Sequence, residues 1–257
     1  MSVRILKKIL KAEIFKKMKQ VIYDSYSELS VKTAEQIAAI ILEKPGALLC
    51  FPAGETSLGT FAHLIELNKK KKISFKDCKI VGLDEWTNLG KMKSENCFSF
   101  LKKHLFDHID YCIDNLCFFD GESADLEKEC VKTDDFIKKY GPIDMVLLGV
   151  GMNGHLGLNE PGTSFDLYSH LVKLSDITKS VGQKYFSDDV KLTSGISLGM
   201  KYISEARTVI LQLNGTKKAG IAKRLVDSEI SVDFPASVAK LHSNAFLLLD
   251  KEAAQYL

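Results

Sequence analysis

Arginine is nearly absent from this 257-residue sequence, which holds it only at Arg4, Arg207 and Arg224. Lysine supplies almost all of the positive charge, and the 35 Lys and Arg residues nearly balance the 33 Asp and Glu residues. A formal net charge of only +2 gives no support for a nucleic-acid partner or an anionic membrane surface. With so few guanidinium groups, any phosphate site must depend on lysine ammonium groups and backbone N–H groups.

Metal-binding and membrane-spanning patterns are also missing. The six cysteines form no Cys-x-x-Cys pair and no cluster with histidine. We therefore expect buried, reduced thiols in a cytoplasmic protein without a metal site. No segment approaches the ~18 apolar residues that span a bilayer. Residues 1–20 are basic and amphipathic but lack an apolar core and a cleavage site, so we expect an opening strand and then a surface helix.

Short apolar runs alternate with helical segments along the chain. The predicted buried strands cover residues 47–52, 79–83, 145–150, 208–213 and 245–249. The predicted helices cover residues 30–43, 56–67, 97–106, 126–140, 194–202 and 216–226. This alternation predicts an α/β fold, with one domain over residues 1–257. We expect a doubly wound, mostly parallel open sheet with helices on both faces, a Rossmann-like architecture. Ligands of such sheets bind beyond the C-terminal ends of the strands.

The first strand is followed by Pro-Ala-Gly-Glu-Thr-Ser, residues 52–57. A strand that ends in a glycine turn and opens a helix presents free N–H groups and the positive end of the helix dipole to an anion. The alternative is local, because Thr56 or Ser57 can simply cap the helix.

The second strand is followed by Asp84, Glu85 and Trp86. A partly desolvated carboxylate at this edge of the sheet is suited to act as a general base. The alternative is that one acid caps a helix or pairs with a lysine. Trp86, the single tryptophan, is expected to pack in the core rather than to stack on a ligand.

The third strand is followed by the glycine-rich stretch Gly149 to Gly162, which carries one imidazole, His155, and one carboxylate, Glu160. Leu-Asn-Glu-Pro-Gly interrupts any helix here, so the stretch is not a dinucleotide-binding fingerprint. A histidine beside a carboxylate is a common way to direct proton transfer, although a purely structural histidine is the alternative. The three strand ends together predict an acid–base enzyme with an anionic ligand.

Three segments of this sequence resemble the glucosamine-6-phosphate deaminase/isomerase family, and they occur in the order PAGETS, GLDEW and GVGMNGHLGLNEPG. A fourth segment, residues 192–219, also resembles that family. The resemblance covers roughly residues 30–250 and is closest to the galactosamine-6-phosphate branch. It implies that a hexosamine 6-phosphate and water become a ketohexose 6-phosphate and ammonia, without a cofactor. It also implies that Asp84 is the general base between C2 and C1, that His155 helps to open the sugar ring, and that Glu160 supports His155.

The resemblance further implies a phosphate site, made by Ala53, Gly54, Glu55 and Thr56 of the first turn together with Lys218. A small-molecule sugar phosphate is therefore the expected partner, and a homo-oligomer is left open. The phosphate would anchor one end of the sugar and position its reacting carbons against the base.

Two positions depart from the family pattern. Asn153 stands where many members carry an aspartate beside the catalytic histidine, which keeps hydrogen bonding but removes a charge. Counting without gaps, Lys184 falls where a phosphate-binding arginine is expected, which keeps the charge but loses the bidentate fork. We expect both residues to belong to the site.

Three other functions compete with a galactosamine-6-phosphate deaminase. One is a glucosamine-6-phosphate deaminase that yields fructose 6-phosphate, because the C4 epimer is not encoded in a recognisable residue. Another is a 6-phosphogluconolactonase-like hydrolase, although the segment after His155 supplies Glu160 where lactonases resemble ASLFP. The last is a non-catalytic sugar-phosphate sensor that kept the fold.

Some members of the family are activated by N-acetylglucosamine 6-phosphate, whose phosphate contacts basic side chains shortly after the Asn-Glu-Pro segment. Gapless counting puts His170 and Val172 at those positions. Neither offers a fixed positive charge, so we expect no activation, unless Lys173 or Lys179 takes over the contact.

Overall fold

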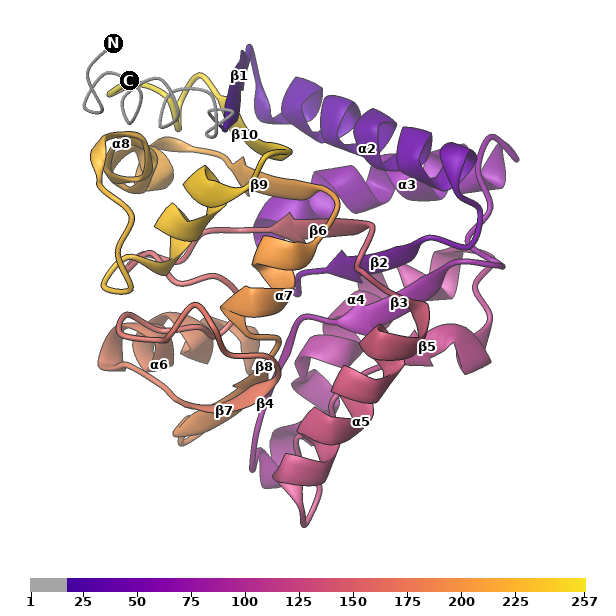
Figure 1. The fold of residues 1–257 in the computed structure, drawn as a ribbon, viewed down its shortest axis with the longest axis vertical. Coiled ribbons are helices and arrows are strands. Elements are labelled where there is room, and N and C mark those ends of the chain that lie inside the picture. The colour runs from indigo at the N-terminus through magenta and orange to yellow at the C-terminus, as the bar shows by residue number, and fades with distance from the viewer. Residues whose placement is uncertain (1–17) are drawn as a thin grey trace, which may run out of the picture.

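Seven parallel strands form the main sheet of the protein, in the order β1-β10-β9-β6-β2-β3-β5 (Figure 1). The structure is a computed structural model that describes residues 18–257, apart from the side chains of residues 91–93. The strands of this sheet are β1 (Lys19–Tyr23), β2 (Leu48–Phe51), β3 (Lys79–Gly82), β5 (Leu116–Cys117), β6 (Met145–Leu148), β9 (Val209–Leu213) and β10 (Ala245–Asp250). Every residue of β2, β6 and β9 is buried, which requires cover on both faces.

Helices supply that cover. On one face α2 (Tyr26–Glu43), α3 (Leu58–Lys69) and α4 (Cys97–His104) bury side chains such as Phe61 and Leu101. On the other face α5 (Leu126–Tyr140), α7 (Met200–Glu205) and α8 (Ala219–Asp227) bury side chains such as Ile137 and Leu225. The prediction of a doubly wound α/β sheet is therefore confirmed.

A second, antiparallel sheet of three strands has the order β4-β8-β7 and was not predicted. It contains β4 (Asp84–Trp86), β7 (His170–Lys173) and β8 (Ser194–Ser197), and it lies with α6 (Asp176–Gly182) beside the main sheet (Figure 1). The helix predicted over residues 194–202 is wrong in its first half, where β8 pairs with β4 and β7. Glycine and serine are weak helix formers, and a Cβ on Gly195 would lie 2.3 Å from the Leu158 side chain, so this strand depends on close backbone packing.

The remaining predicted elements are present with their ends moved by a few residues. Short 3-10 helices complete the described chain: η1 (Glu55–Ser57), η2 (Gly90–Glu95), η3 (Phe106–His108), η4 (Ile113–Asn115), η5 (Gln183–Tyr185), η6 (Thr216–Lys218) and η7 (Pro235–Leu241). The strand and helix expected over residues 1–20 fall mostly outside the described residues, which show β1 from Lys19 onwards. Within residues 18–257, no helix combines the length and the apolar character that crossing a bilayer requires.

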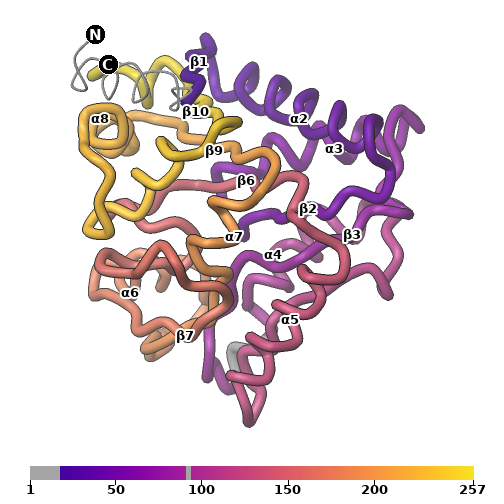
Figure 2. The backbone as a smooth tube through the Cα atoms, viewed as in Figure 1, coloured from indigo at the N-terminus to yellow at the C-terminus, as the bar shows by residue number. Residues whose placement is uncertain are grey.

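The direction in which the chain moves through the main sheet reverses between β2 and β6. From β2 the chain continues to β3 and β5 on one side, whereas β6, β9 and β10 lie on the other side. Strands β2 and β6 lie side by side (Figure 2), and they are hydrogen-bonded neighbours that pair Leu49 with Met145. A crevice at the C-terminal ends of two such strands is where doubly wound proteins bind ligands.

Candidate active site

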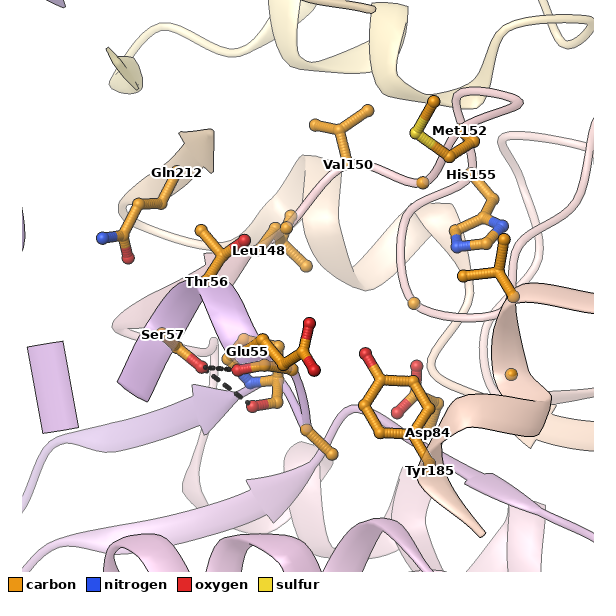
Figure 3. Close-up of a pocket in the computed structure, with 18 of the residues that line it drawn as sticks. Glu55, Thr56, Ser57, Asp84, Leu148, Val150, Met152, His155, Tyr185 and Gln212 are labelled. Atoms are coloured by element: carbon orange, nitrogen blue, oxygen red, sulfur yellow. Dashed lines mark hydrogen bonds between the residues drawn. The ribbon is translucent and has the colours of Figure 1, made fainter. Parts of the chain in front are cut away.

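A cavity of about 1180 Å³ occupies this crevice. Its walls come from the segments that follow β2, β3, β6 and β9, together with α6 and η5 (Figure 3). Every candidate site residue from the sequence lines it except Asn153 and Glu160, which lie buried directly behind His155. The three strand ends therefore meet at one cavity.

The turn after β2 opens the helical segment η1–α3 at the floor of the cavity. Gly54 is extended and η1 starts at Glu55, so the first backbone bond of the turn runs from the Ser57 N–H to the Gly54 carbonyl oxygen at 3.2 Å, and the N–H groups of Glu55 and Thr56 precede any acceptor within the helix. Neither Thr56 nor Ser57 makes a side-chain cap, because the Ser57 hydroxyl donates 2.7 Å to the Gly54 carbonyl oxygen. The Tyr26 hydroxyl braces the turn, donating 3.0 Å to the Thr56 carbonyl oxygen and accepting 2.8 Å from the Gly59 N–H. This geometry leaves the turn free to hold an anion.

Two lysines from different elements line the same cavity as this turn. Lys218, at the end of η6, is anchored by donating 2.5 Å from Nζ to the Val150 carbonyl oxygen. Burial, together with the nearby charge of Lys184, lowers the pKa of Lys218. Lys184, in η5, lies 2.6 Å from a Glu55 carboxylate oxygen. The gapless assignment of Lys184 thus leads to a residue at the cavity, next to the turn.

Asp84 begins β4 and points into the cavity (Figure 3). Burial raises the pKa of Asp84 from 3.8 to about 6, although the charge of His155 and a hydrogen bond from the Cys97 thiol act in the opposite direction. A carboxyl group with such a pKa can take up and return a proton near neutral pH.

Glu85, the next residue, has a different role because adjacent strand residues point to opposite sides. Its buried carboxylate accepts hydrogen bonds from the backbone N–H groups of Trp86, Cys97 and Phe98 at 2.8, 2.9 and 3.1 Å. It therefore caps the start of α4, which is the alternative that the sequence left open for one of the two acids. Trp86 is buried and packs edge-on against Phe186, as expected for a core residue, although it also borders the cavity.

His155 is held in a polar cluster behind the glycine-rich turn. Its Nδ1 lies 3.1 Å from the Thr178 hydroxyl and 3.8 Å from a Glu160 carboxylate oxygen. Asn153 connects the His155 backbone to Glu160, because its side-chain oxygen accepts from the His155 backbone N–H at 3.2 Å and its amide donates 2.7 Å to Glu160. The backbone shape depends on Gly154, whose φ of +91° favours glycine.

Glu160 is ionised in this cluster. Burial acts against its charge, but the interactions with His155 and Thr178 and the hydrogen bond from the Ser175 N–H outweigh it and lower the pKa of Glu160 to about 2. The carboxylate can therefore hold the imidazole of His155 in place and stabilise it when it becomes charged.

The sequence did not reveal three residues of this site. Tyr26 is contributed by the start of α2, and no local pattern marks it. Ser175 and Thr178 belong to a serine-capped helix start, where the Thr178 N–H donates 3.2 Å to the Ser175 hydroxyl, and this capping pattern was visible in the sequence.

The positions expected for an effector phosphate lie in β7 and turn inward. His170 Nε2 is 2.8 Å from the side-chain oxygen of Asn159, and Val172 is buried. Burial lowers the pKa of His170.

Among residues 18–257, no three His, Cys, Asp or Glu side chains gather as a metal site would require.

These features define an acid–base site with an anion-binding end, at the ligand edge of a doubly wound α/β sheet. The chain belongs to the family of glucosamine-6-phosphate isomerases and 6-phosphogluconolactonases, whose model matches residues 24–248. It is 40% identical to the glucosamine-6-phosphate deaminase of Bacillus pumilus over 232 residues, 90% of this chain and 96% of the relative. It is 36% identical to the glucosamine-6-phosphate deaminase of Clostridium novyi over 241 residues, 93% of this chain and all of the relative.

Solved structures support the fold. A monomeric glucosamine-6-phosphate deaminase, 35% identical, superposes with a TM-score of 0.89 over 93% of this chain and all of that chain. The 6-phosphogluconolactonase of Trypanosoma brucei superposes with a TM-score of 0.70 at 20% identity, over 95% of this chain and 99% of that one. At that identity the likeness concerns the fold alone.

Proposed function

We propose that this chain is an amino-sugar-6-phosphate deaminase, which converts a hexosamine 6-phosphate and water to a ketohexose 6-phosphate and ammonia. One observation carries the proposal: a carboxyl group with a raised pKa, a histidine–carboxylate pair and an anion-binding turn with two lysines surround the same cavity. Two carboxyl groups whose environments push their pKa values apart are typical of an acid–base site with divided roles.

In the proposed reaction the substrate phosphate binds to the turn from Ala53 to Thr56 and to Lys218, with Lys184 nearby. His155 exchanges a proton with the ring oxygen as the pyranose opens, while Thr178 and Glu160 hold its imidazole and Asn153 holds Glu160 and the backbone of His155 in place. Remote phosphate binding positions C1 and C2 of the open chain against the base.

Asp84 would then remove the proton from C2 while O1 gains a proton, which gives an enolamine. Asp84 returns its proton to C1 as the amino group loses one, so that C2 becomes an imine and C1 an alcohol. Water adds to this imine, the carbon–nitrogen bond breaks, and ammonia leaves a C2 ketone. The pKa of about 6 suits this role, since a base of that pKa is ionised at neutral pH and still gives its proton back.

The proposed substrate is glucosamine 6-phosphate, which the names of relatives at 32–40% identity support. Galactosamine 6-phosphate is the second candidate, because the segments GMNGHLGLNEPG and DEW, together with residues 235–244, resemble that branch. The two sugars differ only at C4, and both would use the same base, histidine and phosphate turn. A monomer is the quaternary state that the relative with a TM-score of 0.89 supports.

A side-by-side assay of ammonia release tests the proposal. Purified protein is given glucosamine 6-phosphate, galactosamine 6-phosphate and unphosphorylated glucosamine, and the Asp84→Asn variant serves as the inactive control. In parallel, acid release from 6-phosphogluconolactone is followed by pH, and binding of the hexosamine phosphates is measured by calorimetry. Ammonia from either hexosamine phosphate supports the function, and the ratio of kcat/KM values identifies the preferred epimer. Lactone hydrolysis without ammonia would instead mark a lactonase, and tight binding without any turnover would mark a sensor.

A further inference from the structure

An acidic side chain stands on the turn that is proposed to bind phosphate. Glu55 is the first residue of η1, and Figure 3 shows its carboxylate projecting from the turn into the cavity. The backbone of this turn and the lysines around it attract an anion, whereas the Glu55 carboxylate repels one. Its presence weakens the affinity of the turn for phosphate unless something compensates for its charge.

Lys184 provides that compensation in the free protein. Its Nζ lies 2.6 Å from Glu55 Oε2, and this ion pair connects the turn after β2 to η5, 129 residues later in the chain. The side chains of Glu55 and Lys184 are 63% and 44% exposed, so both reach solvent and the pair can open without unpacking the core. A pair this exposed contributes little to folding stability.

Lys184 also has a second support that does not involve Glu55. Its Nζ lies 4.9 Å from the centroid of the Tyr185 ring, in cation–π contact. Both residues line the cavity. If the Glu55 carboxylate moved away, Lys184 would still be held beside the turn by Tyr185.

We propose that the Glu55 carboxylate competes with the substrate phosphate for Lys184 and so sets the affinity of the site for phosphate. The inference rests on the proposed function, because it takes the turn, Lys184 and Lys218 as the phosphate site. Binding is then an exchange: the phosphate takes over Lys184, and the Glu55 carboxylate swings out towards solvent. When the product leaves, Glu55 takes Lys184 back, so the residue lowers the affinity for 6-phosphates and helps the product phosphate to dissociate.

The opposite role, in which Glu55 holds Lys184 ready for the phosphate, predicts the opposite sign. Glu55→Gln keeps the size and hydrogen-bonding capacity of the side chain but removes its charge. Competition predicts that this variant binds phosphate more tightly, whereas preorganisation predicts that it binds phosphate more weakly.

The experiment measures the Kd of inorganic phosphate at pH 7.5 and low ionic strength by calorimetry. It uses the wild type, Glu55→Gln, Lys184→Met and the double variant. Glu35→Gln is the control, because it removes the same charge from an exposed ion pair, Lys32–Glu35, away from the cavity. We expect Glu55→Gln to lower the Kd roughly two- to fivefold, the range that an exposed pair supports, and Lys184→Met to raise it roughly fivefold or more. The gain from Glu55→Gln should disappear when Lys184 is also Met, and Glu35→Gln should bind like the wild type.

Turnover gives a second readout, in which Glu55→Gln should lower KM for the hexosamine phosphate without raising kcat. An unchanged or higher Kd for Glu55→Gln, or an equal gain in the Lys184→Met background, would overturn the exchange. If Lys184→Met still weakens phosphate binding in that case, the phosphate site of the proposed function stands. A wild type that binds no phosphate would overturn both.

Discussion

Replacing Asp84 by asparagine should make the protein more stable and catalytically inert. Burial raises the pKa of this carboxyl group to about 6, so the folded protein carries its negative charge at a cost. Asparagine has nearly the same shape and no charge. The change therefore removes the cost of the buried charge together with the proposed base.

The sign and size follow from proton linkage. An acid whose pKa is higher in the folded state than in the unfolded state destabilises the fold as pH rises between the two values. With pKa values of 3.8 and about 6, the cost at pH 7.5 is about 3 kcal/mol, and at pH 4.5 it is about 1 kcal/mol. These are upper limits, because Asp84 is only partly buried and the cavity admits water.

Thermal unfolding at the two pH values measures this difference. A gain of 1 kcal/mol corresponds to roughly 2–4 °C in a protein of this size, so Asp84→Asn should raise Tm at pH 7.5 by several degrees and much less at pH 4.5. Asp114→Asn, at an exposed position, is the matched control and should leave Tm unchanged at both.

Activity supplies the other half of the prediction. Turnover of the hexosamine phosphate should fall by a factor on the order of 10² or more, and exchange of the C2 hydrogen with solvent deuterium should stop. In the wild type, kcat/KM should fall as pH drops through about 6, because the base must be ionised. A variant with wild-type Tm at pH 7.5 would refute the burial argument, and one that still exchanges the C2 hydrogen would remove Asp84 from the reaction.

Three further predictions concern the histidine, the phosphate and the effector. Gly151→Ala should lower kcat at least roughly tenfold with the circular dichroism spectrum retained, because its Cβ would lie 2.2 Å from His155 Nε2. Gly220→Ala, with no atom within 4 Å and a position outside the cavity lining, should be nearly neutral. Lys218→Ala should reduce kcat/KM for the phosphorylated amino sugar far more than for the unphosphorylated one, and equal losses would make the lysine structural. Substrate saturation curves should be hyperbolic and unchanged by millimolar N-acetylglucosamine 6-phosphate, because the side chains of His170 and Val172 in β7 are turned into the protein. A sigmoidal curve that becomes hyperbolic when the effector is added would contradict this prediction.

The sequence predicts the five inner strands of the main sheet because they are buried on both faces, whereas the edge strand β5, two residues long and only partly buried, was not predicted. Runs such as residues 145–150 are apolar at every position, and that pattern needs no knowledge of the neighbouring strands. The sites at the ends of these strands follow, since parallel strands bring their C-terminal ends to one edge. The sequence alone therefore predicts that Thr56, Asp84 and His155 lie at one edge of the sheet, and all three line the same cavity.

The small sheet could not be predicted in the same way. Strand β8 reads Ser-Gly-Ile-Ser, and its conformation depends on pairing with β4, more than 100 residues earlier, and with β7. Propensity carries no information about such distant partners. For the same reason the division of labour between Asp84 and Glu85 could not be read from the sequence, because it depends on which side of β4 faces the cavity and which faces α4.

The asparagine at position 153 simplifies the charges around His155. Its side-chain amide N–H donates to Glu160 at 2.7 Å, and its side-chain oxygen accepts from the His155 backbone N–H, so both of its polar atoms are hydrogen-bonded. An aspartate there would set a second carboxylate against Glu160, and two such groups in contact cannot both stay ionised without cost. With asparagine, Glu160 keeps one full negative charge, as its pKa of about 2 indicates. Desolvation meanwhile raises the pKa of Asp84 to about 6, close to neutral pH. The departure from the family pattern therefore leaves Glu160 as the one anion beside the imidazole and Asp84 as a separate carboxyl group, which is the separation of roles that the proposed reaction would need.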